Sequence, residues 1–543
     1  MSARRFVDAG AAAGVALGLW VSLHYAFATW TTESDAANPF LLWEGVRQYG
    51  PGFLTTFHYS SDAWLTWPMP LLFAAFATFG AAPPVAFAVG WLLFVGSAGT
   101  VFLVARRAAG TRPALACAIV LLLSNREAIG ELGFLTYPVS HNGPLLLGLL
   151  ALHAAMRWME ERRWASLAVV TVALAAAGLG DPWTELAFSL PLLGAAAVLG
   201  LASPGKRRTA VTLMAAVAAA LLVDHTRLFG LLWFLPSPPL AFGEASHRLR
   251  DIEWLGRIGA MWFNLAPNWG DGYGWVPDGW QTAADLAPLA LAAVAVAALA
   301  AGPARRSTAF ALLWLTGLGS IAAVCSAFVL FDLPPVISMG RLFAAAYVLG
   351  LAMAAAAAGR AWDGLRRPWR AMLAGYAGLL ALSGLASAPG CWASLRLDLT
   401  DDGLRHYGPN VPPFTNGIPQ FAAFLQAHGL HYGYGAYWLV QASAVGWVTH
   451  GAVRVRPVFL VPGTGVIAPF FAQISPEWYT AADGPAGDPA TFLALTPGFL
   501  GCQDIPRCTS QATQQFGPPQ AKLSYEDTTI LVWDHRLFGA VPP

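Results

Sequence analysis

Two acidic residues near the start of the chain are placed to act as a general base. Glu33 and Asp35 lie in the stretch TWTTESDAANPFLLWEGVRQYG, which follows an apolar run at residues 6–28. A carboxylate held at a membrane surface can remove a proton from a hydroxyl or amine group as that group attacks a substrate. The alternative is that these acids cap a helix or lie exposed to water. The residues themselves leave both explanations open.

A short amphipathic helix is expected directly after these acids. Asn38 can cap a helix that begins at Pro39, and Gly50 can end it. Apolar side chains recur at helical spacing within residues 39–49, and about eleven residues are too few to cross a membrane. We therefore expect this helix to lie along the membrane interface, and we expect a second interfacial element at residues 62–80.

Polar residues at the ends of later apolar runs could bind a substrate or a metal. These residues are His141, Asn142, Asp181, Asp224 and His225. His141, Asp224 and His225 offer ligand types that suit a divalent cation, although their spacing does not indicate a metal site. Capping of the helix that follows Pro182 is a sufficient structural explanation for Asp181.

Cationic residues could hold the phosphate group of a substrate. Arg341 stands at the start of an apolar run, and its guanidinium can bind two phosphate oxygens at once. The alternative for Arg341 is an ion pair with a nearby acid such as Asp332. His247, Arg248 and Arg250 form a basic cluster that could meet a phosphate or form a solvated face.

Four of the five cysteines fall into two groups, and Cys391 has no obvious partner in the sequence. Cys502 and Cys508, in the stretch CQDIPRC, are expected to form a local disulfide. Cys117 and Cys325 lie inside apolar runs and are expected to pack as small hydrophobic residues. The spacing lacks the second pair of ligands that a zinc site would need.

The composition places these residues in a membrane protein. The chain has 543 residues, of which 56% are hydrophobic and 11% are charged, and its mean hydropathy is +0.53. About eleven apolar runs are expected to span the membrane, and a net charge of +1 offers no field for nucleic acid. The runs lie near residues 6–28, 83–105, 113–124, 138–156, 164–180, 183–201, 209–223, 282–301, 307–328, 341–359 and 370–388.

Arginine-rich linkers indicate how these spans are oriented. Taken alternately from the N-terminus, these linkers all fall on one side of the membrane, as the positive-inside rule requires. The N-terminus is then cytoplasmic, and the long loops and the C-terminal tail lie outside. Function is therefore expected at the outer face. The sequence contains no Gly-rich phosphate loop followed by Lys, so it does not indicate the use of a cytosolic nucleotide.

Two domains are expected from the change in composition along the chain. Residues 1–388 form a transmembrane catalytic domain with interfacial helices in its first outer loop. Residues 389–543 form an α/β domain, because a helix at 416–430 alternates with strands at 453–461 and 527–533. The expected fold class is a polytopic α-helical membrane protein of about eleven spans with a C-terminal extracytoplasmic α/β domain.

The order of these features resembles that of the GT-C glycosyltransferases, which include the protein O-mannosyltransferases and the lipid A aminoarabinose transferases. The acidic stretch after the first span is similar to the first-loop motif of the family, and SMGRLFAAAY is similar to the Arg-containing start of a late span. GLHYGYGAYWLVQASAVGW is similar to the opening of the exported tail in bacterial members. TYPVSHNGPLL resembles a segment where family members carry Asp, and here His141 and Asn142 stand instead. The resemblance implies that Asp35, or Glu33, is the catalytic acid and that Arg341 faces the carrier phosphate.

The resemblance also implies a reaction and a location. A sugar would move from a polyprenyl-phosphate carrier to a glycan, lipid or protein acceptor at the outer face of a bacterial inner membrane, with the C-terminal domain in the periplasm. Membrane lipids are further partners, and a divalent metal is compatible with the residues but not indicated by their spacing. The alternatives are a transporter or flippase of lipid-linked sugars and a non-catalytic assembly subunit. Nearly uncharged spans, with the acids gathered at their outer ends, favour the enzyme over a transporter.

Overall fold

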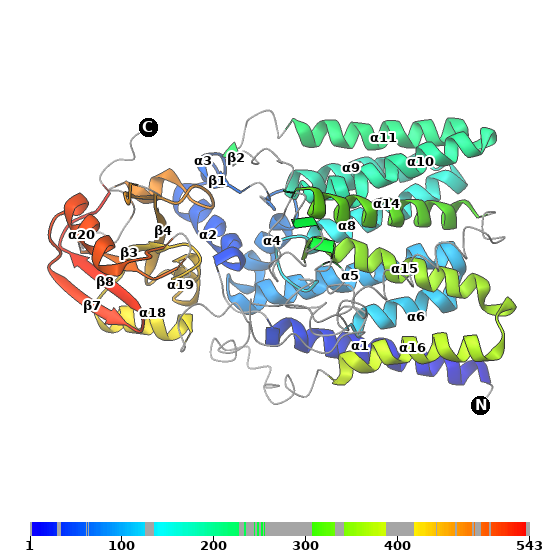
Figure 1. Ribbon diagram of the computed structural model, residues 1–543, viewed down its shortest axis with the longest axis horizontal. Helices are drawn as coiled ribbons and strands as arrows, with labels where there is room; N and C mark the ends of the chain where they lie inside the picture. Colours follow the sequence, from blue (N-terminus) through cyan, green and yellow to red (C-terminus); the bar gives the residue numbers. More distant parts are fainter. Residues whose placement is uncertain are drawn as a thin grey trace.

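The computed structural model of the protein has a bundle of long helices at one end and a mixed β-sheet at the other (Figure 1). The helices of the bundle run side by side along the long axis of the molecule, and the sheet lies beyond one end of them. The structure describes residues 3–29, 34–60, 62, 64–124, 135–226, 233–234, 244, 247–248, 251–252, 255, 307–331, 341–386, 417–440, 442–461, 464–480, 483, 490–498 and 501–538.

Apolar helices form the bundle. They are α1 (Ala3–Thr29), α5 (Pro83–Ala109), α6 (Thr111–Leu122), α8 (Asn142–Glu161), α9 (Trp164–Gly180), α10 (Leu190–Ala202) with a π-helical turn before it (Glu185–Ser189), α11 (Arg207–His225), α14 (Thr308–Leu330), α15 (Ala344–Ala361) and α16 (Arg367–Ala386). Each predicted apolar run except 282–301 coincides with one of these helices, and 282–301 lies outside the described residues. Within the described part of the chain, six helices are long and apolar enough to cross a membrane. The chain is therefore a polytopic helical membrane protein.

A six-stranded mixed sheet dominates the C-terminal part. Its order is β5-β4-β3-β6-β8-β7, with β3 parallel to both β4 and β6 and the other pairs antiparallel. The strands are β3 (Tyr432–Ala436), β4 (Arg454–Leu460), β5 (Ile467–Pro469), β6 (Thr491–Leu495), β7 (Ala521–Tyr525) and β8 (Thr528–Trp533), and the helices around them are α18 (Ile418–Ala427), α19 (Ala442–Val448) and α20 (Ile505–Phe516). The helix α18 and the strands β4 and β8 coincide with the elements expected at these positions. Residues 417–538 are called the sheet domain below.

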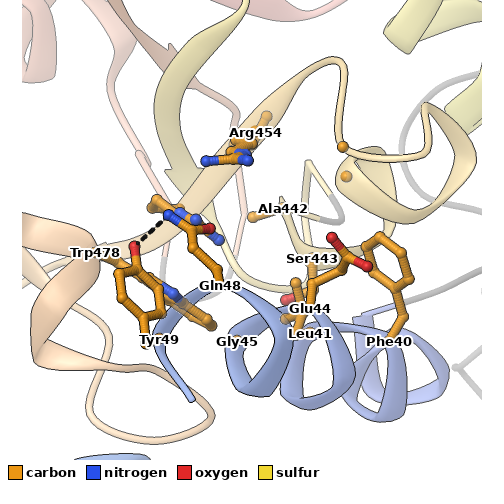
Figure 2. A pocket seen from close by; sticks show the side chains of 14 residues that line it. Phe40, Leu41, Glu44, Gly45, Gln48, Tyr49, Ala442, Ser443, Arg454 and Trp478 are labelled. Atoms are coloured by element: carbon orange, nitrogen blue, oxygen red, sulfur yellow. Dashed lines mark hydrogen bonds between the residues drawn. The ribbon is translucent and has the colours of Figure 1, made fainter. Parts of the chain in front are cut away.

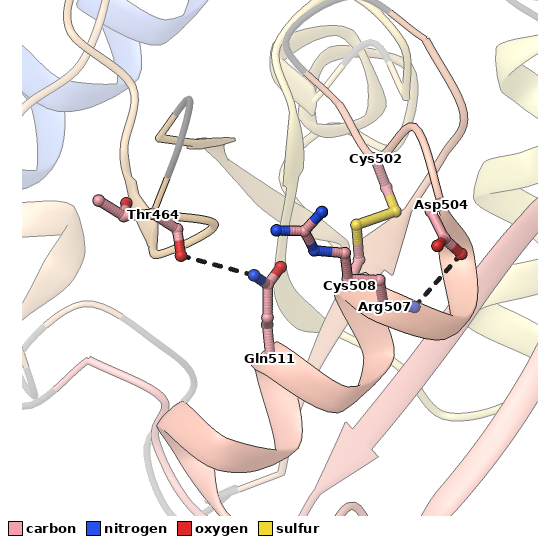
Figure 3. Close-up of a disulfide and its surroundings, with 6 residues drawn as sticks. All are labelled: Thr464, Cys502, Asp504, Arg507, Cys508 and Gln511. Carbon is pink, nitrogen blue, oxygen red and sulfur yellow. Dashed lines mark hydrogen bonds between the residues drawn. A yellow bond between two sulfur atoms is a disulfide. The ribbon is translucent and has the colours of Figure 1, made fainter.

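A disulfide joins Cys502 and Cys508 at the start of α20 (Figure 3). Beside it, the side chain of Asp504 caps the helix by accepting a hydrogen bond from the backbone N–H of Arg507 at 3.4 Å. The bridge and the cap together hold the chain where it enters α20. Cys117, which is buried in α6, forms no disulfide with any described residue.

The segment between α1 and α5 forms α2 (Ser34–Tyr49), α3 (Phe53–Thr56), a short strand β1 (His58–Tyr59) and α4 (Met69–Phe79). Strand β1 pairs in parallel with β2 (Trp233–Phe234). The prediction that α2 begins at Pro39 with Asn38 as its cap was wrong, because the helix begins at Ser34 and Pro39 lies within it. The predicted end at Gly50 is confirmed, and Gly50 has a φ of +83°.

The segment between α1 and α5 shares one hydrophobic core with the sheet domain. Phe40 of α2 stacks on Trp447 of α19 with 6.3 Å between ring centroids, and the indole N–H of Trp447 donates to the carbonyl of Ala81 at 2.8 Å. The backbone N–H of His58 donates to the carbonyl of Ile474 at 2.8 Å. These contacts bury the N-terminal half of α2 against the sheet domain.

A buried ion network reinforces this interface. Asp483 is fully buried and accepts two hydrogen bonds from the guanidinium of Arg456, at 2.8 Å and 3.0 Å. Its two oxygens also accept from the hydroxyl groups of Tyr49 in α2, at 2.9 Å, and Tyr432 in β3, at 3.0 Å. Burial by itself would raise the pKa of Asp483, but the charge and hydrogen bonds of Arg456, together with the hydrogen bonds from Tyr49 and Tyr432, hold that pKa below its ordinary value. The network therefore stabilises the contact of α2 with the sheet domain above the ordinary carboxyl pKa, and this contribution is lost as the pH falls through the lowered pKa.

Replacing Asp483 with alanine is expected to destabilise the sheet domain by about 3–5 kcal/mol, because Arg456 is left buried without its counter-charge. The measurement is thermal or denaturant unfolding of the purified protein in detergent. Arg47→Ala is the matched control, since Arg47 pairs with Glu44 on the exposed side of α2 and should contribute less than about 1 kcal/mol. An Asp483→Ala protein that unfolds like this control would show that the network adds no stability.

Candidate active site

Asp35 lies where α2 meets the loop after β3. Its Oδ1 accepts a hydrogen bond from the hydroxyl of Tyr437 at 2.9 Å, and its carboxylate also accepts one from the side chain of Trp438. The amide nitrogen of Asn38, one turn further along α2, donates to the same Tyr437 oxygen at 3.0 Å. The side chain of Asp35 is partly buried, so the carboxylate is held by the protein rather than lying freely in water.

A second acid, Asp62, is brought in by a segment fastened to the end of α9. The backbone N–H of Trp64 donates to the carbonyl of Gly180 at 3.1 Å, and the hydroxyl of Thr66 donates to the carbonyl of Ala176 at 2.8 Å. A Cβ at Gly180 would lie 2.8 Å from the carbonyl oxygen of Trp67, so only glycine allows this approach. The C-terminal end of α9 therefore sets the position of Asp62.

His141 and Asp181 meet at the same end of the bundle. His141 precedes α8 and Asp181 follows α9, and His141 Nδ1 forms a hydrogen bond with Asp181 Oδ2. Asp181 is almost fully buried, and its other oxygen accepts from the backbone N–H of Trp183 at 3.0 Å. The indole of Trp183 in turn donates to the carbonyl of Leu342 at 2.8 Å, which ties this turn to the residue that follows Arg341.

These side chains act on one another electrostatically. Burial raises the pKa of Asp35, and the opposing effects of Arg341, Tyr437 and Trp438 are smaller. Burial also raises the pKa of Asp62. Arg341 and His141 oppose that rise, whereas Asp181 and Asp35 add to it. Asp35, Asp62, His141, Asp181 and Arg341 thus form one group, called the charged cluster below. A buried carboxyl group with a raised pKa can serve as a base near neutral pH.

The remaining sequence-based candidates do not join the charged cluster in the described part of the structure. Asn142 holds the turn before α8, because its amide donates to the carbonyls of Gly90 and Tyr137 at 2.9 Å and 3.0 Å. This contact gives Asn142 a structural role. Arg248 is exposed. Glu33 and Arg250 lie outside the described residues, as does Asp332, the alternative partner of Arg341.

The candidate metal ligands separate into two groups. Asp224 and His225 gather with Glu185, and the ligand atoms of these three residues lie within 4.8 Å of one another. His141 pairs instead with Asp181 and does not belong to that group. Glu185, Asp224 and His225 could supply three ligands to a divalent cation, with water or substrate completing its coordination.

The pocket between α2 and the sheet domain is a separate feature (Figure 2). It is lined by Glu44 and Gln48 of α2 and by Ser443, Arg454 and Trp478 of the sheet domain. None of the charged cluster lines it. Asp35 and Glu44 lie on opposite sides of α2, because nine positions at about 100° each amount to two and a half turns. A substrate in this pocket would therefore lie on the side of α2 away from the Asp35 carboxylate.

Sequence reasoning missed several residues of the site. Asp62 begins the expected interfacial element at residues 62–80, and the sequence offered it only as a fallback for Asp35 and not as a member of the site. Tyr437 and Trp438 lie in the Tyr- and Trp-rich stretch at the start of the sheet domain, and this stretch was the available signal for them. Asn38 was noticed, but for its capping preference rather than for its contact with Tyr437.

Comparison with known proteins identifies the fold. No protein-family model and no curated protein matches the sequence. The structure is similar to ArnT from Cupriavidus metallidurans bound to undecaprenyl phosphate, with 13% identity, a TM-score of 0.50 and 100% of each chain covered. ArnT in the apo state gives 14% identity and a TM-score of 0.49 over 99% of this chain and 100% of that chain. The Archaeoglobus fulgidus oligosaccharyltransferase in complex with Zn and sulfate gives 13% identity and a TM-score of 0.35 over 81% of this chain and 62% of that chain.

ArnT is a lipid A aminoarabinose transferase of the GT-C type. The likeness to the undecaprenyl phosphate complex extends from the first span through the sheet domain, since it covers both chains completely. At this level of identity the likeness establishes the fold, and it confirms the resemblance inferred from the order of the sequence features. The chain has the GT-C fold.

Proposed function

We propose that the protein is a membrane glycosyltransferase that moves a sugar from a polyprenyl-phosphate carrier to a glycan, lipid or protein acceptor. The observation that carries this proposal is the charged cluster, in which the partly buried carboxylate of Asp35 lies within the electrostatic reach of the Arg341 guanidinium. A base and a phosphate-binding cation are the two groups that such a transfer needs. The fold shared with ArnT, which was solved with undecaprenyl phosphate bound, supports the same donor class.

The proposed step is a substitution at the anomeric carbon of the sugar. The acceptor oxygen or nitrogen forms a bond to that carbon while the bond to the phosphate oxygen breaks. The leaving carrier phosphate takes the bonding electron pair, and the proton of the acceptor passes to Asp35. Arg341 binds the phosphate oxygens and stabilises the charge that grows on them. Asp62 is an alternative base, and His141 with Asp181 would fix the shape of the site around these groups.

We further propose that this site faces outward. Eleven spans, a cytoplasmic N-terminus and a periplasmic domain at residues 389–543 follow from the alternation of the Arg-rich linkers, and residues 1–388 would then form the catalytic membrane domain. Such a protein would reside in the bacterial inner membrane. The acids of the first outer loop would lie at the boundary where a lipid-linked donor meets an acceptor on the outer side.

A reporter that is active only outside the cytoplasm, fused to the C-terminus, is expected to be active. The physical reason is that positively charged linkers remain on the cytoplasmic side. The control is the same reporter fused after Gly110, in an Arg-rich linker, which should stay inactive. A well-expressed C-terminal fusion without activity would contradict the orientation and the outward-facing site.

The transferase activity is tested with purified protein in liposomes. The protein is incubated with a panel of polyprenyl-phosphate sugars and with lipid and protein fractions of the cell envelope as acceptors. Loss of donor together with the release of polyprenyl phosphate is the expected result. Donor that crosses the bilayer without losing its sugar would instead support the transporter or flippase, and donor that stays unchanged in place would contradict both.

A further inference from the structure

The loop after β3 reaches out of the sheet domain to the acid in α2. Tyr437 is almost fully buried, and its ring stacks on Phe470 with 5.0 Å between centroids and 2° between planes. Its backbone carbonyl accepts a hydrogen bond from the hydroxyl of Ser34 at 2.6 Å. The ring and the backbone of Tyr437 are therefore both fixed, and the phenol oxygen has a defined position opposite Asp35.

The hydrogen bonds of Tyr437 have a defined direction. The amide nitrogen of Asn38 can only donate, so the phenol oxygen accepts this bond. The single hydroxyl proton of Tyr437 is then left for Asp35 Oδ1, 2.9 Å away. Two residues of α2 thus hold one tyrosine of the sheet domain between them, one as donor and the other as acceptor.

Trp438 adds a second donor to the same carboxylate. Its side chain donates a hydrogen bond to Asp35, and its ring packs edge-on against Tyr437 with 5.2 Å between centroids. Tyr437 and Trp438, which are neighbours in one loop, therefore both donate hydrogen bonds to Asp35 and leave its carboxylate little freedom to rotate. Arg341 and Asp62 are the charged groups outside the sheet domain that interact electrostatically with Asp35.

We propose that the sheet domain completes the active site, with Tyr437 and Trp438 as positioning residues that hold the Asp35 carboxylate for proton transfer. This inference rests on the proposed function, in which Asp35 is the base. A base must lie within hydrogen-bonding distance of the proton that it removes, and small displacements lower the rate strongly. Turnover therefore requires the sheet domain to be docked on α2, although neither Tyr437 nor Trp438 takes part in the transfer itself.

Tyr437→Phe tests the contact directly, because it removes one oxygen and keeps the ring that stacks on Phe470. The loss of a hydrogen bond to a charged group is expected to lower kcat by about tenfold or more, with the KM for the donor changed by less than about twofold. The bond favours the ionised form of Asp35, so its loss raises the pKa of Asp35 and moves the acidic limb of the pH–rate profile to higher pH. Trp438→Phe should likewise lower kcat and move the acidic limb of the pH–rate profile to higher pH.

Tyr49→Phe is the matched control. It removes a phenol that also donates to a buried aspartate across the same interface, Asp483 at 2.9 Å, but that has no contact with Asp35 in the described structure. This control should keep the wild-type kcat and pH profile even if its melting temperature falls. An equal loss of kcat in Tyr49→Phe would assign the effect of Tyr437 to docking stability alone and overturn the positioning role.

A second measurement does not need turnover. Dicyclohexylcarbodiimide reacts with protonated carboxyl groups in apolar surroundings, and mass spectrometry can follow the labelling of Asp35 against pH. In Tyr437→Phe and Trp438→Phe the labelling should persist to higher pH than in the wild type or in Tyr49→Phe. If this shift occurs but the wild type transfers no sugar from any donor, the contact stands and the proposed function fails. If labelling and kcat in both variants match the wild type, the inference is wrong.

Discussion

Asp35→Asn is expected to lower turnover by about 10²-fold or more, the usual scale for the loss of a general base. Asparagine has nearly the same shape as aspartate, and its side-chain oxygen can still accept the hydrogen bond that Tyr437 donates to Asp35 at 2.9 Å. The substitution therefore removes the ability to accept a proton while keeping the packing of α2 against the sheet domain. The measurement is single-turnover consumption of the donor by purified variant and wild type.

The control for this experiment is the same substitution at an acid remote from the site. Asp363 is exposed in the turn after α15, at the end of that helix opposite to Arg341, and Asp363→Asn should turn over like the wild type. Normal turnover by Asp35→Asn would contradict the role of Asp35. If Asp62→Asn then abolished turnover, the base would be Asp62, whose pKa burial also raises.

The pH dependence of the wild type follows from the same contacts. Burial is the largest influence on Asp35 and raises its pKa, while Arg341 opposes this effect. A base works only when it is deprotonated, so kcat should fall as the pH falls through this raised pKa. The acidic limb should therefore lie above the ordinary range of an aspartate, and it should be absent from the residual activity of Asp35→Asn.

The bundle could be predicted from the sequence because a membrane span is a local property. An apolar run of sufficient length becomes helical wherever the chain folds, so the expected runs coincide with α1, α5, α8 and the other described helices. The strands β4 and β8 could be found for a similar reason, from alternation or from β-branched residues. The order of the sheet could not, because β3 lies between β4 and β6 only through pairings between distant parts of the chain.

The site could be predicted only where a local signal marked it. Asp35, His141, Asp181 and Arg341 each stand beside the end of an apolar run, and the sequence alone selects all of them as candidates. Asn38 shows where local reasoning fails, because its capping preference competes with a hydrogen bond to a tyrosine 399 positions away, and the distant contact prevails.

Asp62 could be offered from the sequence only as a fallback for Asp35, for a related reason. Its position depends on hydrogen bonds that its neighbours Trp64 and Thr66 make to the C-terminal end of α9. Contacts of this kind join segments that lie far apart in the sequence, and the spacing of residues within the loop does not predict them. Such an acid can be recognised only after the helices that receive the loop have been placed.

Arg341→Ala is expected to abolish most use of the donor and to weaken its binding by about 30-fold or more, the scale of about 2–5 kcal/mol for truncating one member of a hydrogen-bonded charge pair. Arg341→Lys keeps the charge but loses the paired N–H groups that match two phosphate oxygens, so binding should fall between alanine and wild type. The measurement is the binding of a polyprenyl-phosphate sugar to purified protein. Arg367→Ala, an exposed arginine beyond the other end of α15, is the control and should bind as the wild type does.

The alternative role of Arg341 is purely structural, since its charge also acts on Asp35 and Asp62. Binding and titration separate the two roles. Removing the guanidinium raises the pKa of both acids, because an opposing positive charge is lost, and the acidic limb of the pH–rate profile then moves to higher pH in either case. Donor binding weakens only if Arg341 contacts the phosphate. An Arg341→Ala protein with native donor affinity and a shifted acidic limb would therefore assign Arg341 to holding the acids, and the carrier phosphate would need another partner.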